Sequence, residues 1–266
     1  MQFDFGKNWD EFSRHALDGA KVAQAKESFE LLFDGIELKG KYFLDIGFGQ
    51  GLSLLIATEM GAITTGIDIN PTCSEVLKRN AGFYPDLDIT KIKVVTGSIL
   101  DPQIIQDLKS SKQMPGEEFE IVHSWGVLHH TGNMYRAIIN AASLVTSGGY
   151  FVLAIYNKHW TSPLWLVIKW CFNKSPRWLQ KMMIGLFYPV IWLAKLIVTG
   201  KNPLNQERGM DFFYDIIDWL GGYPYEYASR KEIQTFLNQL GFKNIRTIPA
   251  QVPTGCNEFI FMRKAK

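Results

Sequence analysis

The sequence predicts an α/β fold in which a mostly parallel sheet carries helices on both faces. Five short runs rich in β-branched and aromatic residues alternate with helical segments between residues 41 and 156. These runs are 41–46, 63–68, 92–97, 119–124 and 149–156. Each has the length of a buried strand, and the segments between them are typical of crossover helices. This alternation is characteristic of a parallel sheet that is buried on both faces.

Helix-start signals separate the predicted strands. Asn70 and Asp101 each precede a proline, which places a capping residue just before a favoured first helical position. Thr131 and Asn133 open a further helical window. Near the C-terminus, the 229–232 segment has the pattern of a capping box and precedes an amphipathic helix. Two more strands, at about 243–248 and 256–262, complete the predicted sheet.

Three parts follow from this order of elements. Residues 1–39 form an N-terminal helical arm, with a helix expected from Asp18 to Phe33. Residues 40–157 and 228–266 form the sheet domain. Residues 158–227 are an insertion that an alternating α/β unit does not need, and it is helical and rich in tryptophan. We expect this insertion to act as a cap that forms a wall of an acceptor site.

The apolar surface of the insertion has two interpretations. If 177–199 is a single helix, its polar residues cover only about 100° of its circumference at 3.6 residues per turn. Either this surface is buried in a cap, or the 160–200 region makes a peripheral contact with a membrane. The most apolar stretch, 182–198, contains Pro189 and Lys195 and is shorter than the roughly 20 residues of a spanning helix.

Composition restricts the partners and the compartment. The 266 residues carry a net charge of +2, from 28 basic and 26 acidic side chains, which does not favour nucleic acid. Three widely spaced cysteines argue against a disulfide framework and against a metal site. The first residues lack the apolar run of a secretory signal. We therefore expect a cytoplasmic protein, with peripheral attachment to the inner face of a membrane as the alternative.

The most informative motif is the run DIGFGQG at 45–51, between the first strand and the first helix of the sheet domain. A dinucleotide loop would need a glycine at position 52, where this chain has leucine. Glycines allow a ligand close to the backbone, and the acid at Asp45 would attract an ammonium group. Asp68, at the end of the second strand, is placed to bind ribose hydroxyls. S-adenosylmethionine (SAM) has both an ammonium group and a ribose.

The motifs FLDIGFGQG, GIDIN (66–70), TGSI (96–99) and HSWGVLHHTGN (123–133) occur in an order that resembles the class I SAM-dependent methyltransferases. The similar branch includes quinone-biosynthesis and sugar O-methyltransferases. The resemblance implies a Rossmann-like, seven-stranded, mostly parallel sheet, with SAM as cofactor and S-adenosylhomocysteine (SAH) as product. It implies cofactor contacts by Asp45, Gly47, Gly49, Gly51, Asp68, Ile69, Ser98, Ile99 and Trp125. Ser98 stands where the family often has aspartate, so backbone at 98–99 would contact the adenine.

Two adjacent histidines follow the fourth strand. The Asn/Asp-Pro-Pro-aromatic tetrad used to hold an amine for N-methylation and the Pro-Cys pair used for cytosine methylation are both absent from this position. A hydroxyl acceptor needs its proton removed, and histidine is suited to that step. We interpret His130, and next to it His129, as the base, against the alternative that one ring packs or orients the loop. Candidate acceptor contacts are Trp9, Asn157, His159, Arg208, Asp215, Tyr223 and Glu226.

The predicted activity is methyl transfer from SAM to a small-molecule acceptor, at the oxygen of a sugar or another hydroxyl compound. A lipid-like phenolic quinone precursor or a thiol, methylated at a membrane surface, is the first alternative. A binding module that keeps the fold without the chemistry is the second. The sequence does not determine the oligomeric state.

Overall fold

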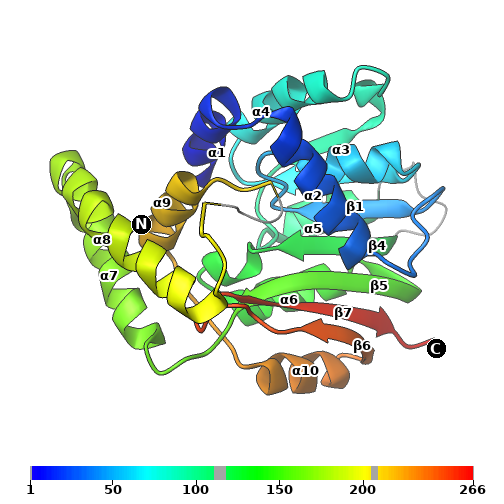
Figure 1. The fold of residues 1–266 in the computed structure, drawn as a ribbon. Helices are drawn as coiled ribbons and strands as arrows, with labels where there is room; N and C mark the ends of the chain where they lie inside the picture. Colours follow the sequence, from blue (N-terminus) through cyan, green and yellow to red (C-terminus); the bar gives the residue numbers. More distant parts are fainter. Residues whose placement is uncertain (1, 111–117, 205–208, 266) are drawn as a thin grey trace.

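The computed structural model describes residues 2–110, 118–204 and 209–265. Within them, seven strands form one sheet in the order β3-β2-β1-β4-β5-β7-β6 (Figure 1). Neighbouring strands from β3 to β5 are parallel, whereas β7 is antiparallel to both β5 and β6. The predicted α/β class is confirmed. The strands are β1 (Tyr42–Ile46), β2 (Ile63–Asp68), β3 (Lys93–Thr96), β4 (Phe119–Trp125), β5 (Val145–Tyr156), β6 (Phe242–Ile248) and β7 (Cys256–Arg263).

Helices cover both faces of this sheet and bury two apolar clusters against it. One face packs against α2 (Gly19–Leu32), α3 (Leu52–Glu59) and α4 (Thr72–Asn80). The other face packs against α5 (Pro102–Lys109), α6 (Met134–Ala142) and α10 (Arg230–Gln239). Because both faces are covered, the central strands β1, β2 and β4 are buried along most of their length, as expected for a parallel sheet.

The helix-start signals act as expected. The Asp101 carboxylate accepts a hydrogen bond from the backbone N–H of Gln103, and Asn133 caps α6 in the same way. Ser229 and Glu232 form both bonds of the capping box at the start of α10. Asn70 accepts from the N–H of Thr72 and so satisfies a donor in the first turn of α4. Each cap satisfies a backbone donor that has no partner inside its helix.

The N-terminal arm contains one helix that the sequence reasoning did not assign. Helix α1 (Phe5–His15) begins after Asp4, whose carboxylate accepts from the N–H of Lys7. Its buried residues include Asn8 and Phe12, four positions apart on one face. That face contacts α4 and α9, so α1 lies over the carboxyl ends of β1 and β2. The spacing of Phe5, Trp9 and Phe12 was the sequence signal for this amphipathic helix.

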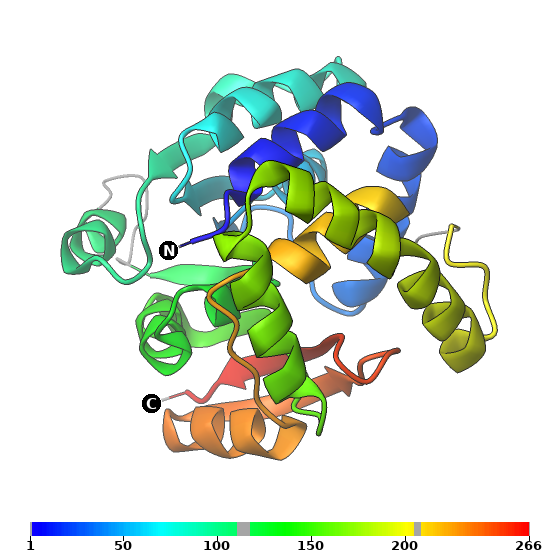
Figure 2. The ribbon, with the colours of Figure 1, turned by 90° about the vertical axis from the view of Figure 1, so that its left-hand side faces the viewer.

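The insertion at 158–227 contains α7 (Ser162–Lys174), α8 (Arg177–Thr199) and α9 (Phe212–Gly221). Helix α8 is a single helix, as expected, and Gly200 ends it at a φ of +67°. Helix α9 lies between the sheet domain and the α7–α8 pair, which forms the outer layer (Figures 1 and 2). These helices share a small apolar core built on Phe172, Ile191 and Ile216.

The described residues do not bury all of the apolar surface of the insertion, so both interpretations of this surface stay open. In α8, Ile191 is the one residue that is fully buried, and the outward side chains are exposed. Within the described residues, α8 is also the one helix whose length and composition would suffice to cross a membrane.

Candidate active site

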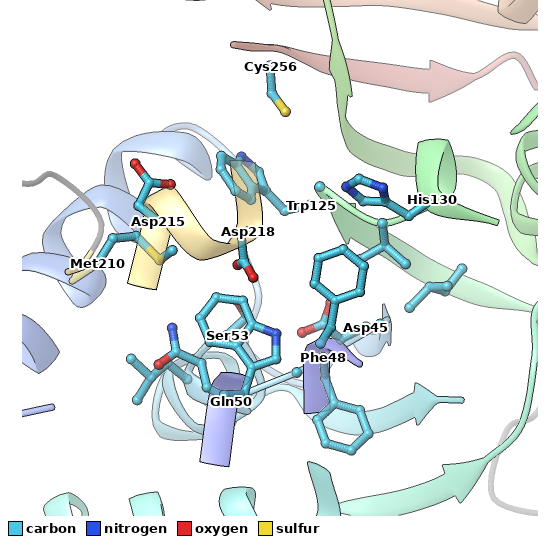
Figure 3. A pocket seen from close by; sticks show the side chains of 18 of the residues that line it. Asp45, Phe48, Gln50, Ser53, Trp125, His130, Met210, Asp215, Asp218 and Cys256 are labelled. Atoms are coloured by element: carbon cyan, nitrogen blue, oxygen red, sulfur yellow. The ribbon is translucent and has the colours of Figure 1, made fainter. Parts of the chain in front are cut away.

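A cavity of about 710 Å³ opens at the carboxyl edge of the parallel strands. Its walls come from the ends of β1, β2, β4 and β5, with α1 and α9 on the opposite side. Figure 3 shows Asp45, His130 and Asp218 arranged around this cavity. Open parallel sheets bind their ligands at this edge, and the volume is that of a small-molecule site.

The glycine-rich turn after β1 serves two purposes. Gly47 and Gly49 line the cavity with φ values of +74° and +53°. A Cβ atom at Gly47 would lie 2.4 Å from Val127, and one at Gly49 would lie 2.8 Å from the indole nitrogen of Trp9. Gly51 does not line the cavity; a Cβ there would lie 2.5 Å from Leu77 of α4. Two glycines therefore shape the cavity, while the third permits close packing of α3 against α4.

Asp45 is buried at the end of β1 and lines the cavity. Its carboxylate lies 2.8 Å from Nδ1 of His123, which is directly opposite on the parallel neighbour β4. The ring of His123 packs among aromatic side chains, including Phe43. The contact with His123 fixes the direction of the Asp45 carboxylate. Sequence reasoning missed His123, because its partner is evident only from the register of β1 and β4.

Asp68 ends β2 and also lines the cavity. One carboxylate oxygen accepts from the N–H of Gly49 at 3.0 Å, and the other from the N–H of Asn70 at 2.9 Å. Burial raises the pKa of Asp68, while these two hydrogen bonds act in the opposite direction. The Cys73 side chain is a third hydrogen-bond partner of this carboxylate. Because a carboxylate can accept about four hydrogen bonds, Asp68 keeps acceptor capacity for a ligand.

The remaining candidate cofactor residues lie around the same space. Ile69 is exposed beside Asp68, and Ser98, Ile99 and Trp125 complete the lining. The Ser98 hydroxyl accepts from the N–H of Leu100, so it shapes the turn after β3. The structure therefore brings every candidate cofactor residue except Gly51 to one cavity.

The two adjacent histidines have different surroundings. Nδ1 of His130 lies 2.6 Å from the carbonyl oxygen of Pro224. Because a carbonyl can only accept, Nδ1 carries the proton, and Nε2 is the acceptor of the ring. His130 lines the cavity, and burial lowers its pKa to about 3. The ring is therefore neutral, with an acceptor nitrogen at the cavity.

His129 faces the protein interior. It is fully buried, is absent from the cavity lining, and its Nδ1 accepts from the N–H of Tyr156 at 3.4 Å. Burial lowers its pKa well below the usual value. The structure thus favours the packing interpretation for His129 and keeps His130 as the histidine that can meet an acceptor.

The candidate acceptor residues divide in the same way. Trp9 and Asp215 line the cavity, and Asp215 lies 3.4 Å from Nζ of Lys195. Tyr223 lies outside the lining, and its carbonyl accepts from the N–H of Phe3. Arg208 lies outside the described residues.

Three other candidates hold loops rather than the cavity wall. The Asn157 side chain donates to the carbonyl of Pro253, and Nδ1 of His159 pairs with the hydroxyl of Thr161. The Glu226 carboxylate accepts from the N–H of Met134 at the start of α6, where a negative charge stabilises the helix terminus. None of the three belongs to the cavity lining, so we do not retain them as acceptor contacts.

Asp218 lines the cavity but was not among the acceptor contacts predicted from the sequence. It lies one helical turn after Asp215 on α9, and its carboxylate accepts from the side chain of Asn8 at 2.7 Å. Burial and the nearby Asp215 raise the pKa of Asp218 to about 8. Asp215 and Asp218 are three residues apart, and this spacing in the sequence already indicated that they share one helix face.

Lys169 links α7 to the C-terminal end of α9. Its Nζ is buried and donates to the carbonyls of Asp218 and Trp219, at the end of α9, at 3.4 and 2.5 Å. It also lies 4.9 Å from the ring centre of Tyr225. Burial lowers the pKa of Lys169 to about 7. A lysine at the C-terminus of a helix is favoured by the helix dipole, so Lys169 attaches α7 to α9.

Residues 20–247 match the model of a family described as a methyltransferase domain. This chain belongs to that methyltransferase family. The resemblance of the motifs is therefore confirmed.

Curated relatives of the methyltransferase carry a more specific name. A ubiquinone biosynthesis O-methyltransferase from Coxiella burnetii is 29% identical over 144 residues, or 53% of this chain and 56% of the relative. The protein of the same name from Dechloromonas aromatica is 33% identical over 134 residues, or 50% of this chain and 52% of the relative. The match thus spans about half the length of the curated relatives.

Solved structures show the fold of the methyltransferase. Magnesium protoporphyrin IX methyltransferase from Synechocystis PCC 6803, with bound SAH, has a TM-score of 0.56 at 17% identity, covering 97% of this chain and 95% of that one. An O-methyltransferase family protein from Burkholderia thailandensis has the same TM-score at 12% identity, covering 97% of this chain and 60% of that one. The Rossmann-like methyltransferase fold is confirmed.

Proposed function

We propose that this methyltransferase transfers the methyl group of SAM to a hydroxyl oxygen of a small acceptor. One observation carries the proposal. A single cavity joins the carboxylates at the ends of β1 and β2 to two proton acceptors, His130 and Asp218. The first pair suits the two polar ends of SAM, and the second pair suits a hydroxyl group that must lose its proton.

The side chains present fit the cofactor. Asp68 keeps lone pairs for ribose hydroxyls, and Ile69 beside it offers an apolar surface for adenine. Asp45 would face the ammonium group. Gln50 adds a buried amide oxygen that lacks a partner among the described residues and lies in the cavity lining. A donor on the amino-acid part of the cofactor would satisfy it.

When bound, SAM supplies a methyl group already activated on a positively charged sulfur. The protein has to hold the acceptor oxygen in line and keep water away, and such positioning can lower a barrier by about 7–11 kcal/mol. Trp9 of α1 and Trp219 of α9 line the side of the cavity opposite the sheet. These indole rings would exclude water from the reacting groups.

Two cavity residues with different properties can act on the acceptor hydroxyl. Nε2 of His130 can accept a hydrogen bond from the acceptor hydroxyl and orient it. Asp218, with its pKa raised to about 8, is the better proton acceptor, because a base works best when its pKa is close to the working pH. We therefore assign orientation to His130 and proton acceptance to Asp218.

The printed names of the relatives favour a phenolic hydroxyl over a sugar hydroxyl as acceptor. They give no support to the sugar. A thiol acceptor would be more acidic than a phenol and would need less help from a base. A non-catalytic module would not need proton acceptors at the cavity.

The test is a screen of phenols, sugars and thiols with purified protein, in which SAH release is measured. We expect turnover with a phenol. His130→Ala should lower that turnover at least about 10-fold, because the hydroxyl loses its orienting acceptor, and should leave SAH affinity unchanged by calorimetry. His129→Ala is the matched control, because His129 does not line the cavity. SAH binding without turnover of any acceptor would favour the non-catalytic module instead.

A further inference from the structure

The outer faces of α7 and α8 carry apolar side chains that no described part of the chain covers. On α8 the exposed side chains recur every three or four residues, which places them on one side of the helix. Leu186 and Ile197 are 67% and 73% exposed. The outer α7–α8 face consists of Trp160, Leu164, Val167, Trp170, Trp178, Met182, Leu186, Val190, Leu193 and Ile197.

The inner side of α8 is already used inside the protein. Ile191 is buried, and Trp192 packs into the core that α8 shares with α9. Lys195 reaches from α8 to Asp215 on α9. A helix anchored in this way cannot be surrounded by lipid, although its 23 residues would span about 35 Å. It can present only its outer face to a partner.

The positive charge of this region favours an anionic partner. No aspartate or glutamate occurs between Glu120 and Glu207, whereas residues 158–204 contain seven lysines and arginines. Three of these, Lys174, Arg177 and Lys181, are exposed at the corner between α7 and α8. Exposed apolar side chains with only positive charges beside them are typical of surfaces that bind anionic lipids.

Tryptophans accompany this surface. Trp160, Trp170 and Trp178 are exposed before α7, on α7 and at the start of α8. An indole ring has an apolar body and a polar N–H, which suits the boundary between lipid and water. Figure 2 shows α7 and α8 together on the side facing the viewer, so a flat surface can reach both helices at once.

We propose that the outer α7–α8 face docks on an anionic lipid bilayer, with α8 lying in the plane of the interface. Lys195, Thr199 and Lys201, at the C-terminal end of α8, also line the cavity. Docking would therefore bring the cavity close to the lipid and admit an acceptor that partitions into the bilayer. This last consequence rests on the proposed methyl transfer, whereas the docking itself does not.

The test is co-sedimentation of the purified full chain with vesicles of phosphatidylcholine, alone or mixed with phosphatidylglycerol. We expect the chain to pellet with the anionic vesicles and to bind the neutral ones less well. Added salt should weaken the binding, because it screens the lysines and arginines from the lipid.

A double variant locates the contact. Leu186→Glu with Ile197→Glu should lower the partition coefficient at least about 10-fold, because two charges would enter the apolar part of the interface. Leu31→Glu with Ile245→Glu is the matched control, since both residues are exposed apolar side chains on α2 and β6. SAH binding measured without vesicles reports whether each variant is folded.

Three outcomes would overturn the proposal: no pelleting with either vesicle, equal pelleting of the α8 variant and its control, or a dimer replacing lipid binding. In the last case, light scattering would show a dimer that the α8 variant converts to monomer, and the face would belong to a second copy. Turnover of a water-soluble phenol without vesicles is measured separately. Its failure would concern the proposed function and not the docking.

Discussion

The direction and protonation of several cavity side chains are set by their hydrogen-bond partners. Asp45 is directed by His123, and the protonated nitrogen of His130 is determined by the carbonyl of Pro224. Asp68 receives two backbone N–H groups, one from the glycine turn and one from the residue that opens α4. In each case a neighbouring group sets the direction or the protonation of the functional atom.

The pH dependence of the reaction distinguishes the roles of Asp218 and His130. With its pKa raised to about 8, Asp218 gains its negative charge as the pH rises through that value, so kcat at saturating SAM should rise towards pH 8 and then level off. His130, with a pKa of about 3, is neutral throughout this range and adds no slope above pH 5. Asp218→Asn should remove the rise and lower kcat about 100-fold.

Initial rates from pH 6 to 9 with the identified phenol test this assignment. Asp211→Asn is a suitable control, because Asp211 caps α9 and is absent from the cavity lining. A pH profile unchanged by Asp218→Asn would rule out Asp218 as the proton acceptor. Loss of SAH affinity in that variant would instead place Asp218 beside the amino-acid part of the cofactor.

At the scale of elements, helix α10 shows how local sequence and tertiary contact combine. Its capping box is readable from Ser229 and Glu232 alone. The structure adds Lys158, just after β5, whose Nζ lies 2.8 Å from the Glu232 carboxylate. The hydrogen bond from Lys158, together with those from Ser229, lowers the pKa of Glu232 to about 2.

This lowered pKa predicts a pH-dependent contribution to stability. A group whose pKa is lower in the folded state stabilises the fold above its unfolded value and loses that effect as the pH falls through the folded value. Glu232→Gln should therefore lower the free energy of unfolding by about 0.5 kcal/mol at pH 7, a small effect because solvent screens the exposed pair. The difference from wild type should shrink as the pH falls from about 4.5 towards 2.

Urea unfolding of both proteins between pH 3 and 7 measures this difference. Glu27→Gln, at an exposed position of α2, controls for the simple loss of one negative charge. A difference that stays constant over the whole range would mean that the carboxylate charge of Glu232 does not stabilise the fold.

At the scale of the whole molecule, the cavity joins segments that are far apart in the chain. Its lining includes Trp9 from the N-terminal arm, Asp68 from the sheet domain and Asp218 from the insertion. A ligand bound there contacts all three parts of the chain, so it should stabilise the entire fold. At 100 times its dissociation constant it adds about 2.7 kcal/mol, because it binds the folded state alone.

SAH should therefore raise the melting temperature of the whole protein by several degrees in one transition. Asp68→Ala should weaken SAH binding about 10- to 100-fold, and at the same SAH concentration this should remove at least about half of the shift. Differential scanning calorimetry with and without SAH checks both points, and Asp88→Ala, on the surface before β3, serves as control. A full shift in Asp68→Ala would remove the ribose assignment.

The strands, most of the helices, the capping residues and the glycine motif were readable from local sequence, whereas helix α1 was not assigned. Local patterns sufficed because buried parallel strands are apolar along their length, and because caps act within one helical turn. The cavity residues Asp45, Asp68 and His130 were readable for the same reason, since carboxyl ends of parallel strands meet at one edge.

The local sequence pattern contains no information on contacts between distant segments. Gly51 carries the same signal as Gly47, and only its packing against Leu77 of α4 separates them. His129 and His130 are adjacent, and only the fold turns one inward and the other to the cavity. Asp218 and Lys169 acquire their shifted pKa values from burial among residues that are distant in the sequence, and Asn8, which donates to Asp218, lies 210 positions away.

The sequence alone therefore determined the fold class, the family and the edge of the sheet at which the ligand binds, because these depend on the order of local patterns. The tertiary structure decided which polar side chains face that ligand and which face of α8 remains open. Burial, protonation and exposure are set by neighbours that the chain brings together only when it is folded.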